Sequence, residues 1–267
     1  MRVLKQGEYF GSQRWELRQK GIVLSEYDYL EPGTPWHFHE NPYFMYVIKG
    51  EMLDLNKACK TELVAGDLMF LNWQEPHCTE KHSNSGRGFH LQLDRKWLDF
   101  NDQNAQLYEG SKIMDDPSVH LVLSKIYFEF RKSDEFSVLS IEVLVMDLCN
   151  ILRKNSSPKM KEVPAWIIKL KDILHSCPNH LSLNELSEQL GVHPVHISRS
   201  IPLFLDSTLG EYMRKLRIKK ALPLVLNKGN SLSQIAYECG FSDQSHFNRV
   251  FRGYYNHSPK EYRSILT

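Results

Sequence analysis

Three histidines in the first third of the chain have the residue type and spacing of a metal or ligand site. His37 and His39 lie one residue apart in WHFHENPYFMYVIKG (36–50), and His77 follows in QEPHC (74–78). Because side chains two residues apart on a strand point to the same face, we expect the first two imidazoles to lie side by side. Three neutral imidazoles can hold Zn²⁺ and leave a fourth position open.

The residues alone leave three interpretations of these histidines open. They are fold residues whose ring nitrogens are satisfied by hydrogen bonds, polar groups of a pocket for a small-molecule effector, or metal ligands. The pocket interpretation includes Trp36, His37, His39, Tyr43, Trp73 and His77. A metal at His37, His39 and His77 is the least favoured of the three, so no cofactor is assigned. The sequence shows no nucleophile elbow, phosphate loop or dinucleotide fingerprint, and we do not expect an enzyme.

A second set of candidate residues lies in a repeat near the end of the chain. The segment LNELSEQLGVHPVHISR (183–199) matches LSQIAYECGFSDQSHFNR (232–249). Each copy reads as a helix, a tight turn that carries Gly191 or Gly240, and a second helix. One such helix-turn-helix pattern has many false positives, but two in tandem, joined by a basic helix at 211–222, predict binding to double-stranded DNA.

The second helix of each copy is expected to contact the bases. Its apolar residues point inward, and its outward residues are polar side chains of the kind that read base edges or hold phosphates. The predicted contacts are His193, Val195, His196, Arg199 and Ser200 in the first copy, Arg214 on the basic helix, and Ser242, Asp243, Gln244, Ser245, Asn248 and Arg249 in the second copy.

Local signals fix where these helices begin and end. Ser182 predicts a capping box at the start of the first copy, Pro194 suits a first helical position, and Ser242 is expected to cap the last reading helix. Pro202 and Pro223 fall where helix is otherwise predicted. Since an interior proline costs about 3 kcal/mol unless the helix ends or kinks there, a shortened first reading helix is expected.

The C-terminal repeat resembles the AraC/XylS family of bacterial transcription regulators. The strongest part is IAYECGFSDQSHFNRVFRGYYNHSPKEYR (235–263), and the resemblance covers roughly residues 164–264. Family members commonly pair this DNA-binding domain with an N-terminal cupin-like domain for sensing and dimerisation. The resemblance therefore implies a regulator that responds to an effector bound in the front half.

The front half resembles the cupin barrel. His37, His39 and His77 match three of the four usual cupin ligands, but Tyr43 stands where the motif has a glutamate. A neutral phenol is a poor substitute for the carboxylate that iron-type cupin chemistry generally uses. The resemblance thus favours a barrel kept for sensing or folding over a metalloenzyme.

Periodicity divides the chain into two domains of an α+β protein. Short β-branched and aromatic runs predict an antiparallel β-barrel to about residue 110, and helical spacing follows over 117–155. Together with the two resemblances, this periodicity predicts a cupin-like sensing and dimerisation domain at 1–155, a linker at 156–163, and an all-α domain with two helix-turn-helix motifs at 164–267.

The charge distribution supports this division and indicates which kinds of partner to expect. Residues 161–267 hold 14 Lys and Arg against 9 Asp and Glu, whereas residues 1–160 hold 19 against 23. A basic back half suits a polyanion such as DNA. Further expected partners are a small-molecule effector and a second copy of the chain, and RNA polymerase is a candidate.

Two alternatives to an effector-controlled regulator stay open. One is a regulator controlled by its abundance or by a protein partner, and the other is a metal-dependent cupin enzyme fused to a DNA-binding domain.

The remaining composition is that of an ordinary globular protein. Apolar residues make up 42% and charged residues 24% of the 267 residues. No signal-peptide core or bilayer-length apolar run occurs, so a cytoplasmic location without membrane contact is expected. The five scattered cysteines are expected to be reduced: Cys59, Cys78, Cys149, Cys177 and Cys239.

Overall fold

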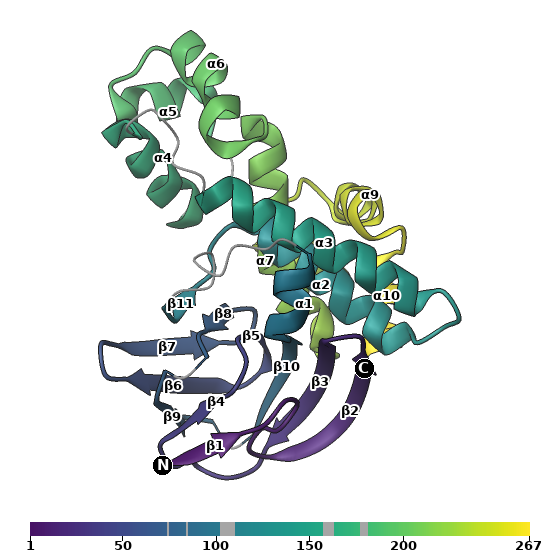
Figure 1. The fold of residues 1–267 in the computed structure, drawn as a ribbon. Coiled ribbons are helices and arrows are strands. Elements are labelled where there is room, and N and C mark those ends of the chain that lie inside the picture. The colour runs from purple at the N-terminus through teal and green to yellow at the C-terminus, as the bar shows by residue number, and fades with distance from the viewer. Residues whose placement is uncertain (74, 84, 102–109, 157–162, 177–180) are drawn as a thin grey trace. The chain divides into compact units, whose positions relative to one another are not determined.

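The computed structural model describes residues 1–267 except 74, 84, 102–109, 157–162 and 177–180 (Figure 1). It separates into two compact units, Met1–Ser156 and Ser157–Thr267. The predicted linker at 156–163 falls almost wholly outside the described residues. Each unit is considered by itself below.

The described residues of the first unit form two β-sheets and three helices. Its strands are β1 (Arg2–Leu4), β2 (Ser12–Gln19), β3 (Ile22–Tyr29), β4 (His37–His39), β5 (Tyr43–Lys49), β6 (Glu51–Asn56), β7 (Lys60–Val64), β8 (Leu68–Leu71), β9 (His77–Lys81), β10 (Gly86–Leu93) and β11 (Lys112–Ile113). One sheet has the order β1-β4-β9-β6-β7 and the other β11-β8-β5-β10-β3-β2. All named strand pairs are antiparallel except β1 with β4, in agreement with the predicted cupin-like architecture.

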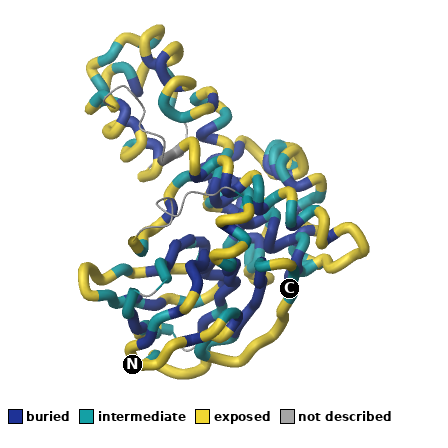
Figure 2. Tube along the Cα trace, viewed as in Figure 1, coloured by how far each residue is buried: buried dark blue, intermediate teal, exposed yellow. Residues whose placement is uncertain are grey.

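The helices of this unit are α1 (Arg95–Phe100), α2 (Pro117–Lys132) and α3 (Ser137–Ser156). Helical spacing predicted α2 and α3 over 117–155, whereas α1 was not expected. Asp116 caps α2 through a bond from the Ser118 amide, and Pro117 opens the helix. Buried residues follow the strands and the facing sides of the helices (Figure 2).

Strands β3 and β10 are buried on both faces because a different layer covers each side. On β10, Phe89 contacts the rings of Tyr127 and Phe130 in α2, with centroids 4.9 and 5.4 Å apart. The next residue, His90, points to the opposite side and stacks on Tyr9. Alternation along a strand thus places one residue against the helices and its neighbour in the interior between the sheets.

A buried carboxylate joins β3 to α2. Glu26 is fully buried, and its Oε2 lies 2.9 Å from Arg131 Nη1 and 3.1 Å from the Tyr127 hydroxyl. Its Oε1 lies 3.5 Å from Arg14 and 3.6 Å from Arg87. Because a buried charge is costly unless it is paired and hydrogen-bonded, this cluster fixes where α2 crosses the sheet.

Every element that the structure describes in the second unit is a helix. Its helices are α4 (Ala165–Ser176), α5 (Leu183–Leu190), α6 (Pro194–Leu205), α7 (Leu209–Leu226), α8 (Leu232–Glu238), α9 (Gln244–Tyr255) and α10 (Pro259–Leu266). The predicted repeat is therefore α5–α6 and α8–α9. Its turns match in detail, because Gly191 and Gly240 have φ of 65° and 77°, and the next amides donate to Ser187 O and Ala236 O.

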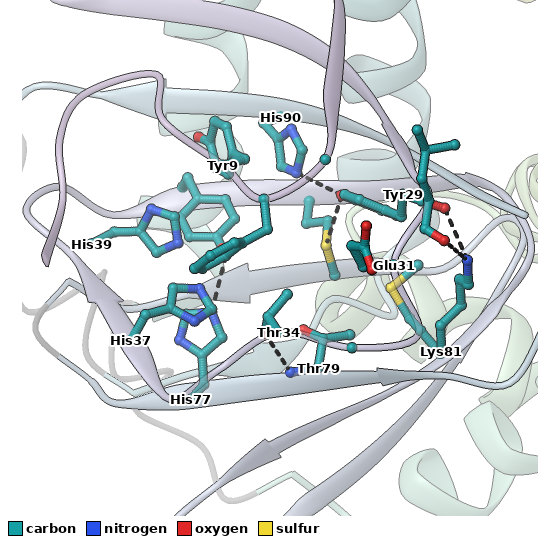
Figure 3. Close-up of a pocket in the computed structure, with 17 residues that line it drawn as sticks. Tyr9, Tyr29, Glu31, Thr34, His37, His39, His77, Thr79, Lys81 and His90 are labelled. Atoms are coloured by element: carbon teal, nitrogen blue, oxygen red, sulfur yellow. Dashed lines mark hydrogen bonds between the residues drawn. The ribbon is translucent and has the colours of Figure 1, made fainter. Parts of the chain in front are cut away.

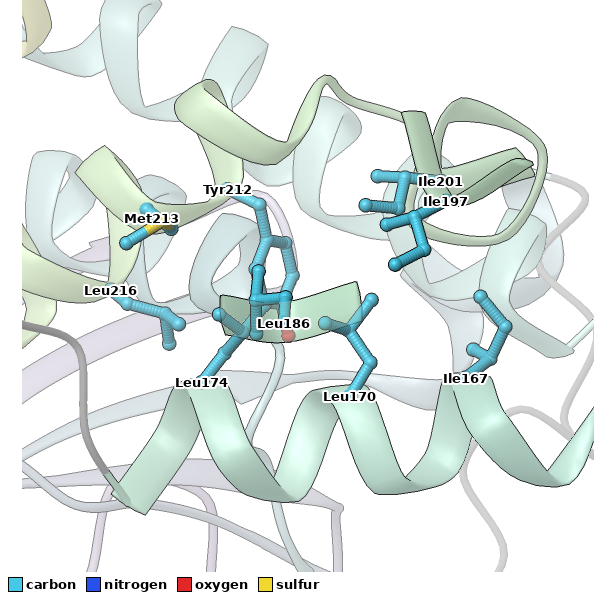
Figure 4. Packing of buried hydrophobic residues seen from close by; sticks show 9 residues of the cluster. All are labelled: Ile167, Leu170, Leu174, Leu186, Ile197, Ile201, Tyr212, Met213 and Leu216. Carbon is cyan, nitrogen blue, oxygen red and sulfur yellow. The ribbon is translucent and has the colours of Figure 1, made fainter. Parts of the chain in front are cut away.

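Apolar side chains from four helices fill the first half of this unit (Figure 4). The cluster comprises Ile167, Leu170, Leu174, Leu186, Ile197, Ile201, Tyr212, Met213 and Leu216. Ile197 and Ile201 lie one turn apart on α6, which turns the opposite side of that helix outward. The capping box predicted at Ser182 is present, with Glu185 as its partner.

The two interior prolines do not end their helices, so the predicted shortening of the first reading helix is wrong. Helix α6 continues three residues beyond Pro202 and reaches the same 12-residue length as α9. Phe204 and Leu205, beyond the proline, pack against the core cluster. Their burial holds the chain in helical form past the missing backbone hydrogen bond. Helix α7 likewise continues beyond Pro223.

Candidate functional site

A cavity of about 110 Å³ lies between the two sheets of the first unit (Figure 3). The residues that line it are Tyr9, Phe10, Gly11, Tyr29, Leu30, Glu31, Gly33, Thr34, His37, His39, Tyr43, Met45, Met52, His77, Thr79, Lys81 and His90. Four of the six predicted pocket residues are among them. Side chains therefore do not fill the centre of the barrel completely.

The two predicted tryptophan walls are wrong. Trp36 directly precedes β4, and since His37 points inward, strand alternation turns Trp36 outward, where it is 44% exposed. Trp73 lies in the turn before β9, and the Arg95 guanidinium sits 4.2 Å above its ring. Neither side chain reaches the cavity.

Tyrosines and a fourth histidine, which the sequence interpretation missed, form the walls instead. Tyr9 stacks on His90 with ring centroids 3.7 Å apart, and the Tyr29 hydroxyl lies 2.8 Å from His90 Nε2. The inward position of His90 could have been predicted, because the segment GFHLQLD has the alternation of a strand and places His90 on its inward face. Tyr9 had none, since it lies in the turn before β2 and joins the site only in three dimensions.

The three predicted histidines do come together, as the labelled side chains in Figure 3 show. One ligand atom from each of His37, His39 and His77 lies within 4.8 Å of the others. His37 Nδ1 is 2.8 Å from Pro35 O, and His77 Nδ1 is 3.2 Å from Glu75 O. Because a carbonyl only accepts, both rings carry their proton on Nδ1 and present the Nε2 lone pair inward.

Such a donor set has the chemistry to hold a divalent ion, because metal-bound imidazoles usually donate their other nitrogen to a carbonyl. Among the described residues, however, no carboxylate joins this group. Glu40 is exposed and accepts from the Gln6 amide at 3.2 Å. Tyr43, at the glutamate position of the cupin motif, places its hydroxyl 3.3 Å from His77 Nε2. The phenol thus occupies the Nε2 lone pair of His77.

Burial keeps the imidazoles of the cavity uncharged. Desolvation is the largest cause that lowers the pKa of His39 to about 2, of His77 to about 4 and of His90 to about 3, and it also lowers the pKa of His37. Neighbouring imidazoles lower the pKa of His39 further. At neutral pH the site therefore offers neutral donors and acceptors rather than positive charge.

Asp54, on β6, has the opposite shift. Burial, reinforced by the charge of Glu75, raises the pKa of Asp54 to about 7, compared with roughly 3.9 in an unfolded chain. Between these two values the folded state binds the extra proton, so the free energy of unfolding falls as pH rises from about 4 to 7. The loss is complete above pH 7.

We expect Asp54→Asn to stabilise the first unit much more at pH 8 than at pH 5. Asparagine keeps the shape of the side chain but has no charge to bury, so the gain at pH 8 should be on the order of 2–4 kcal/mol. Thermal unfolding of both proteins across this pH range measures it. The same change in melting temperature at both pH values would contradict the raised pKa.

In the second unit, the predicted reading residues of the last helix share one exposed side. Gln244, Ser245 and Arg249 of α9 are exposed, Asn248 is half-buried, and Arg252, one turn after Asn248, is also exposed. Phe247 and Phe251 are fully buried on the opposite side. The side chain of Gln244 is oriented by a 2.6 Å bond from Ser233 Oγ on α8.

Asp243, not Ser242, caps α9, which corrects the predicted cap. Asp243 Oδ1 accepts from the His246 amide at 2.7 Å, and this bond holds the pKa of the Asp243 carboxyl below its usual value. The Ser242 hydroxyl instead lies 3.2 Å from Asp243 Oδ2 and 3.1 Å from His246 Nδ1. An aspartate caps well because its charge also favours the positive helix end.

The corresponding side of α6 bears Val195, His196 and Arg199, all exposed. His193 precedes the helix and accepts from the Val195 amide through Nδ1 at 3.3 Å. Ser200 is a further correction, because only 8% of it is exposed. It aligns in the repeat with the apolar Val250, so the repeat itself carried the signal that this position faces inward.

Arg214 lies on the exposed side of α7, the helix between the two copies. Burial raises the pKa of the Tyr254 hydroxyl, and a hydrogen bond from Arg214 opposes that shift. The basic residue is thereby held next to α9. Lys215 pairs with Glu211 at 3.4 Å and Lys220 donates to Glu238 O at 2.7 Å, so part of the positive charge of α7 is used within the unit.

Comparison with known proteins shows what this unit is similar to. A family model described as a helix-turn-helix domain matches residues 186–265. The HTH-type transcriptional activator RhaS of Escherichia coli O139:H28 is 31% identical over 140 residues, 49% of this chain and 48% of that relative. An AraC-type regulator structure from Chromobacterium violaceum is 24% identical, with a TM-score of 0.36, and covers 38% of this chain and 92% of its own. Residues 186–265 of the second unit thus match a helix-turn-helix domain.

The residues that carried the AraC resemblance are mostly structural in this domain. Phe247 and Phe251 contact each other's rings, and Phe251 also contacts Tyr262 of α10. Ser258 forms a capping box with Glu261 at the start of α10. Arg263 donates to Val225 O at 2.7 Å and so fastens α10 to α7. The AraC signature therefore records how the last helices hold α9 in place.

The comparisons reach the first unit much less strongly than the helix-turn-helix domain. The chain spans about half the length of the curated relatives it matches. Over 93% of this chain and 99% of its own, apo ToxT from Vibrio cholerae aligns with 16% identity and a TM-score of 0.40. The curated relatives are transcriptional activators, not enzymes. Among the described helices, none has the length and apolar character needed to cross a bilayer.

Proposed function

We propose that the protein is a sequence-specific transcription regulator that responds to a small molecule bound in its first unit. The observation that carries this proposal is the pair of exposed polar helix faces on α6 and α9, presented by a tandem helix-turn-helix domain. The named relatives are transcriptional activators, which supports the same role here. RNA polymerase is the partner that activation would require.

The direct test is selection of bound sequences from a random DNA pool with the full-length protein. We expect recovery of two short motifs spaced by about one helical turn, because each reading helix would occupy one segment of major groove. Binding should weaken with rising salt, since phosphate contacts release counterions. Recovery of DNA with no shared motif would contradict sequence-specific regulation.

The effector part of the proposal is supported by the cavity. A regulator controlled only by its abundance needs no internal space, and its barrel would be expected to be filled with side chains. Here the cavity is open and combines aromatic walls with a few positioned polar groups, as ligand pockets do. A bound molecule would favour one arrangement of the two units, and so one spacing of the reading helices on DNA.

We also propose that the protein forms a homodimer, and this proposal is based on an apolar stripe on α3. Phe136 just before the helix and Leu139 and Val143 within it are 64%, 63% and 55% exposed, and they follow helical spacing. Exposed large apolar side chains gathered along one helix mark an interaction surface. We propose that this stripe pairs with the same stripe of a second copy.

We expect Leu139→Lys to shift the protein from dimer to monomer and to raise the dissociation constant at least about tenfold. The ammonium group would have to be buried without a partner in the proposed interface. Light scattering after size exclusion at several concentrations measures the mass. Leu203→Lys, a similarly exposed leucine on α6, is the matched control and should leave the mass unchanged. Equal masses for the wild type and both variants would contradict the α3 interface.

A further inference from the structure

We infer that the barrel cavity takes a small uncharged molecule that donates a hydrogen bond to His37 and packs against tyrosine rings, and that it discriminates against carboxylates. This inference rests on the proposed sensing function and narrows it to one chemical class of effector. It is supported by two observations. The inward atoms of the histidines mainly accept hydrogen bonds, and the charged side chains of the lining are bonded within the protein or exposed.

The inward polar atoms of the histidine group mainly accept hydrogen bonds. The Nδ1 proton of His37 is used by Pro35 O and that of His77 by Glu75 O, so each ring offers an Nε2 lone pair. The Tyr43 hydroxyl fills the lone pair of His77 at 3.3 Å. His37 Nε2 is left as an acceptor that requires a donor from the ligand.

His39 adds a second polar position next to it. The side chain is 1% exposed, and its Nδ1 has no hydrogen-bond partner among the described residues. Since a neutral imidazole carries one donor and one acceptor, His39 can complement a hydroxyl that both gives and receives a hydrogen bond. A carboxylate has lone pairs only, and it would meet the lone pair of His37 with no proton between them.

The two charged side chains of the described lining either bond to the protein itself or lie at the rim of the cavity. The amine of Lys81 donates to Tyr29 O at 3.1 Å and to Leu30 O at 2.9 Å. Glu31, the one carboxylate among the lining residues described, is exposed. Figure 3 shows Lys81 turned away from His37, His39 and His77. An ionised ligand seated against these histidines would therefore lose its hydration with no charged side chain beside it, which is costly for either sign.

The walls and the volume set the shape of the ligand. Tyr9, Tyr29, Tyr43 and Phe10 surround the polar end, and Tyr9 contacts the rings of both His39 and Tyr43, with centroids 5.2 Å away in each case. At roughly 10–15 Å³ for each water on this scale, about 110 Å³ holds several waters. The space suits a compact molecule with one flat apolar face and a hydroxyl group.

The test uses three probes that share one ring and differ in charge: benzyl alcohol, benzoate and benzylamine. Each is titrated into chelator-treated full-length protein, and binding is followed by calorimetry and by chemical shifts of the tyrosine and histidine rings. We expect benzyl alcohol to bind at least about tenfold more tightly than benzoate or benzylamine. Tighter binding of either ion would overturn the inference while leaving a ligand-binding first unit in place.

Two variants locate the binding. His37→Leu removes the acceptor and should weaken benzyl alcohol about three- to tenfold, the range of one neutral hydrogen bond. Trp36→Leu changes the preceding residue, which lies outside the cavity, and should leave affinity unchanged. Undiminished binding by a folded His37→Leu protein would place the ligand elsewhere and overturn the inference.

Two further outcomes separate this inference from the broader proposal. If none of the three probes binds the wild type, the inferred ligand class is wrong and the inference fails, but sensing of a ligand of another class is not contradicted. If benzoate binds only after Zn²⁺ is restored, the histidine group is a metal site that recruits anions. That result would overturn the uncharged class but keep a ligand-responsive barrel.

Discussion

Replacing Arg249 with alanine should weaken binding to the selected DNA sequence by about 10- to 100-fold while leaving the fold intact. Arg249 is exposed on α9, on the side opposite the buried Phe247 and Phe251, so its truncation removes no core contact. A guanidinium that reads a guanine edge contributes about 1–3 kcal/mol of discrimination. Fluorescence anisotropy with specific and scrambled duplexes at a fixed salt concentration measures the change.

The ratio of specific to scrambled affinity distinguishes base reading from phosphate binding at Arg249. Loss of a base contact lowers that ratio, whereas loss of a phosphate contact weakens both duplexes alike and reduces the salt dependence. Lys171→Ala removes an exposed charge of the same sign from α4 and serves as the control. Retained selectivity in Arg249→Ala, with control and variant equal, would mean that another side of α9 faces the DNA.

Phe247→Ala should destabilise the second unit by about 3–5 kcal/mol, the usual range for a fully buried phenylalanine. Its ring lies 5.0 Å from Phe241 and 5.6 Å from Phe251 between centroids, so truncation leaves a cavity among residues that cannot close it easily. Such a loss is a large part of the stability of most domains, and DNA binding should fall with it.

Calorimetry of the full-length protein tests this, because two compact units are expected to unfold in separate transitions. We expect the unfolding transition of the second unit to move to lower temperature while that of the first unit stays in place. Ser245→Ala, on the exposed side of α9, is the control and should shift neither transition. If both transitions moved together in Phe247→Ala, the two units would not unfold separately.

The arrangement of the second unit could be read largely from the sequence because it depends on local signals. Phe247 and Phe251 lie one turn apart and fix which side of α9 is buried, which leaves Gln244, Ser245 and Arg249 exposed. Their contacts with DNA stay predictions. Ser200 was misplaced because a small hydroxyl side chain suits either side of a helix.

The walls of the cavity could not be read in the same way. The prediction placed Trp36 in the pocket, but strand alternation gives the inward position to its neighbour His37 and turns Trp36 outward. Tyr9 and His90 are far apart in the chain and meet only because β10 pairs with β3 beside the turn that precedes β2. Such contacts depend on sheet order and register, which residue spacing within one strand does not determine.

Strand β10 also gives the first unit a very short route between its interior and its helices. His90 and Phe89 are adjacent in sequence, yet one borders the cavity and the other touches α2, so a single peptide plane separates the two environments. On β3, Tyr29 and Glu26 divide in the same way between the cavity and the ion-pair cluster that holds α2. A movement of either strand would therefore change the cavity and the contacts with α2 at the same time. No chain of intermediary residues would be needed to carry such a change from the cavity to the helix.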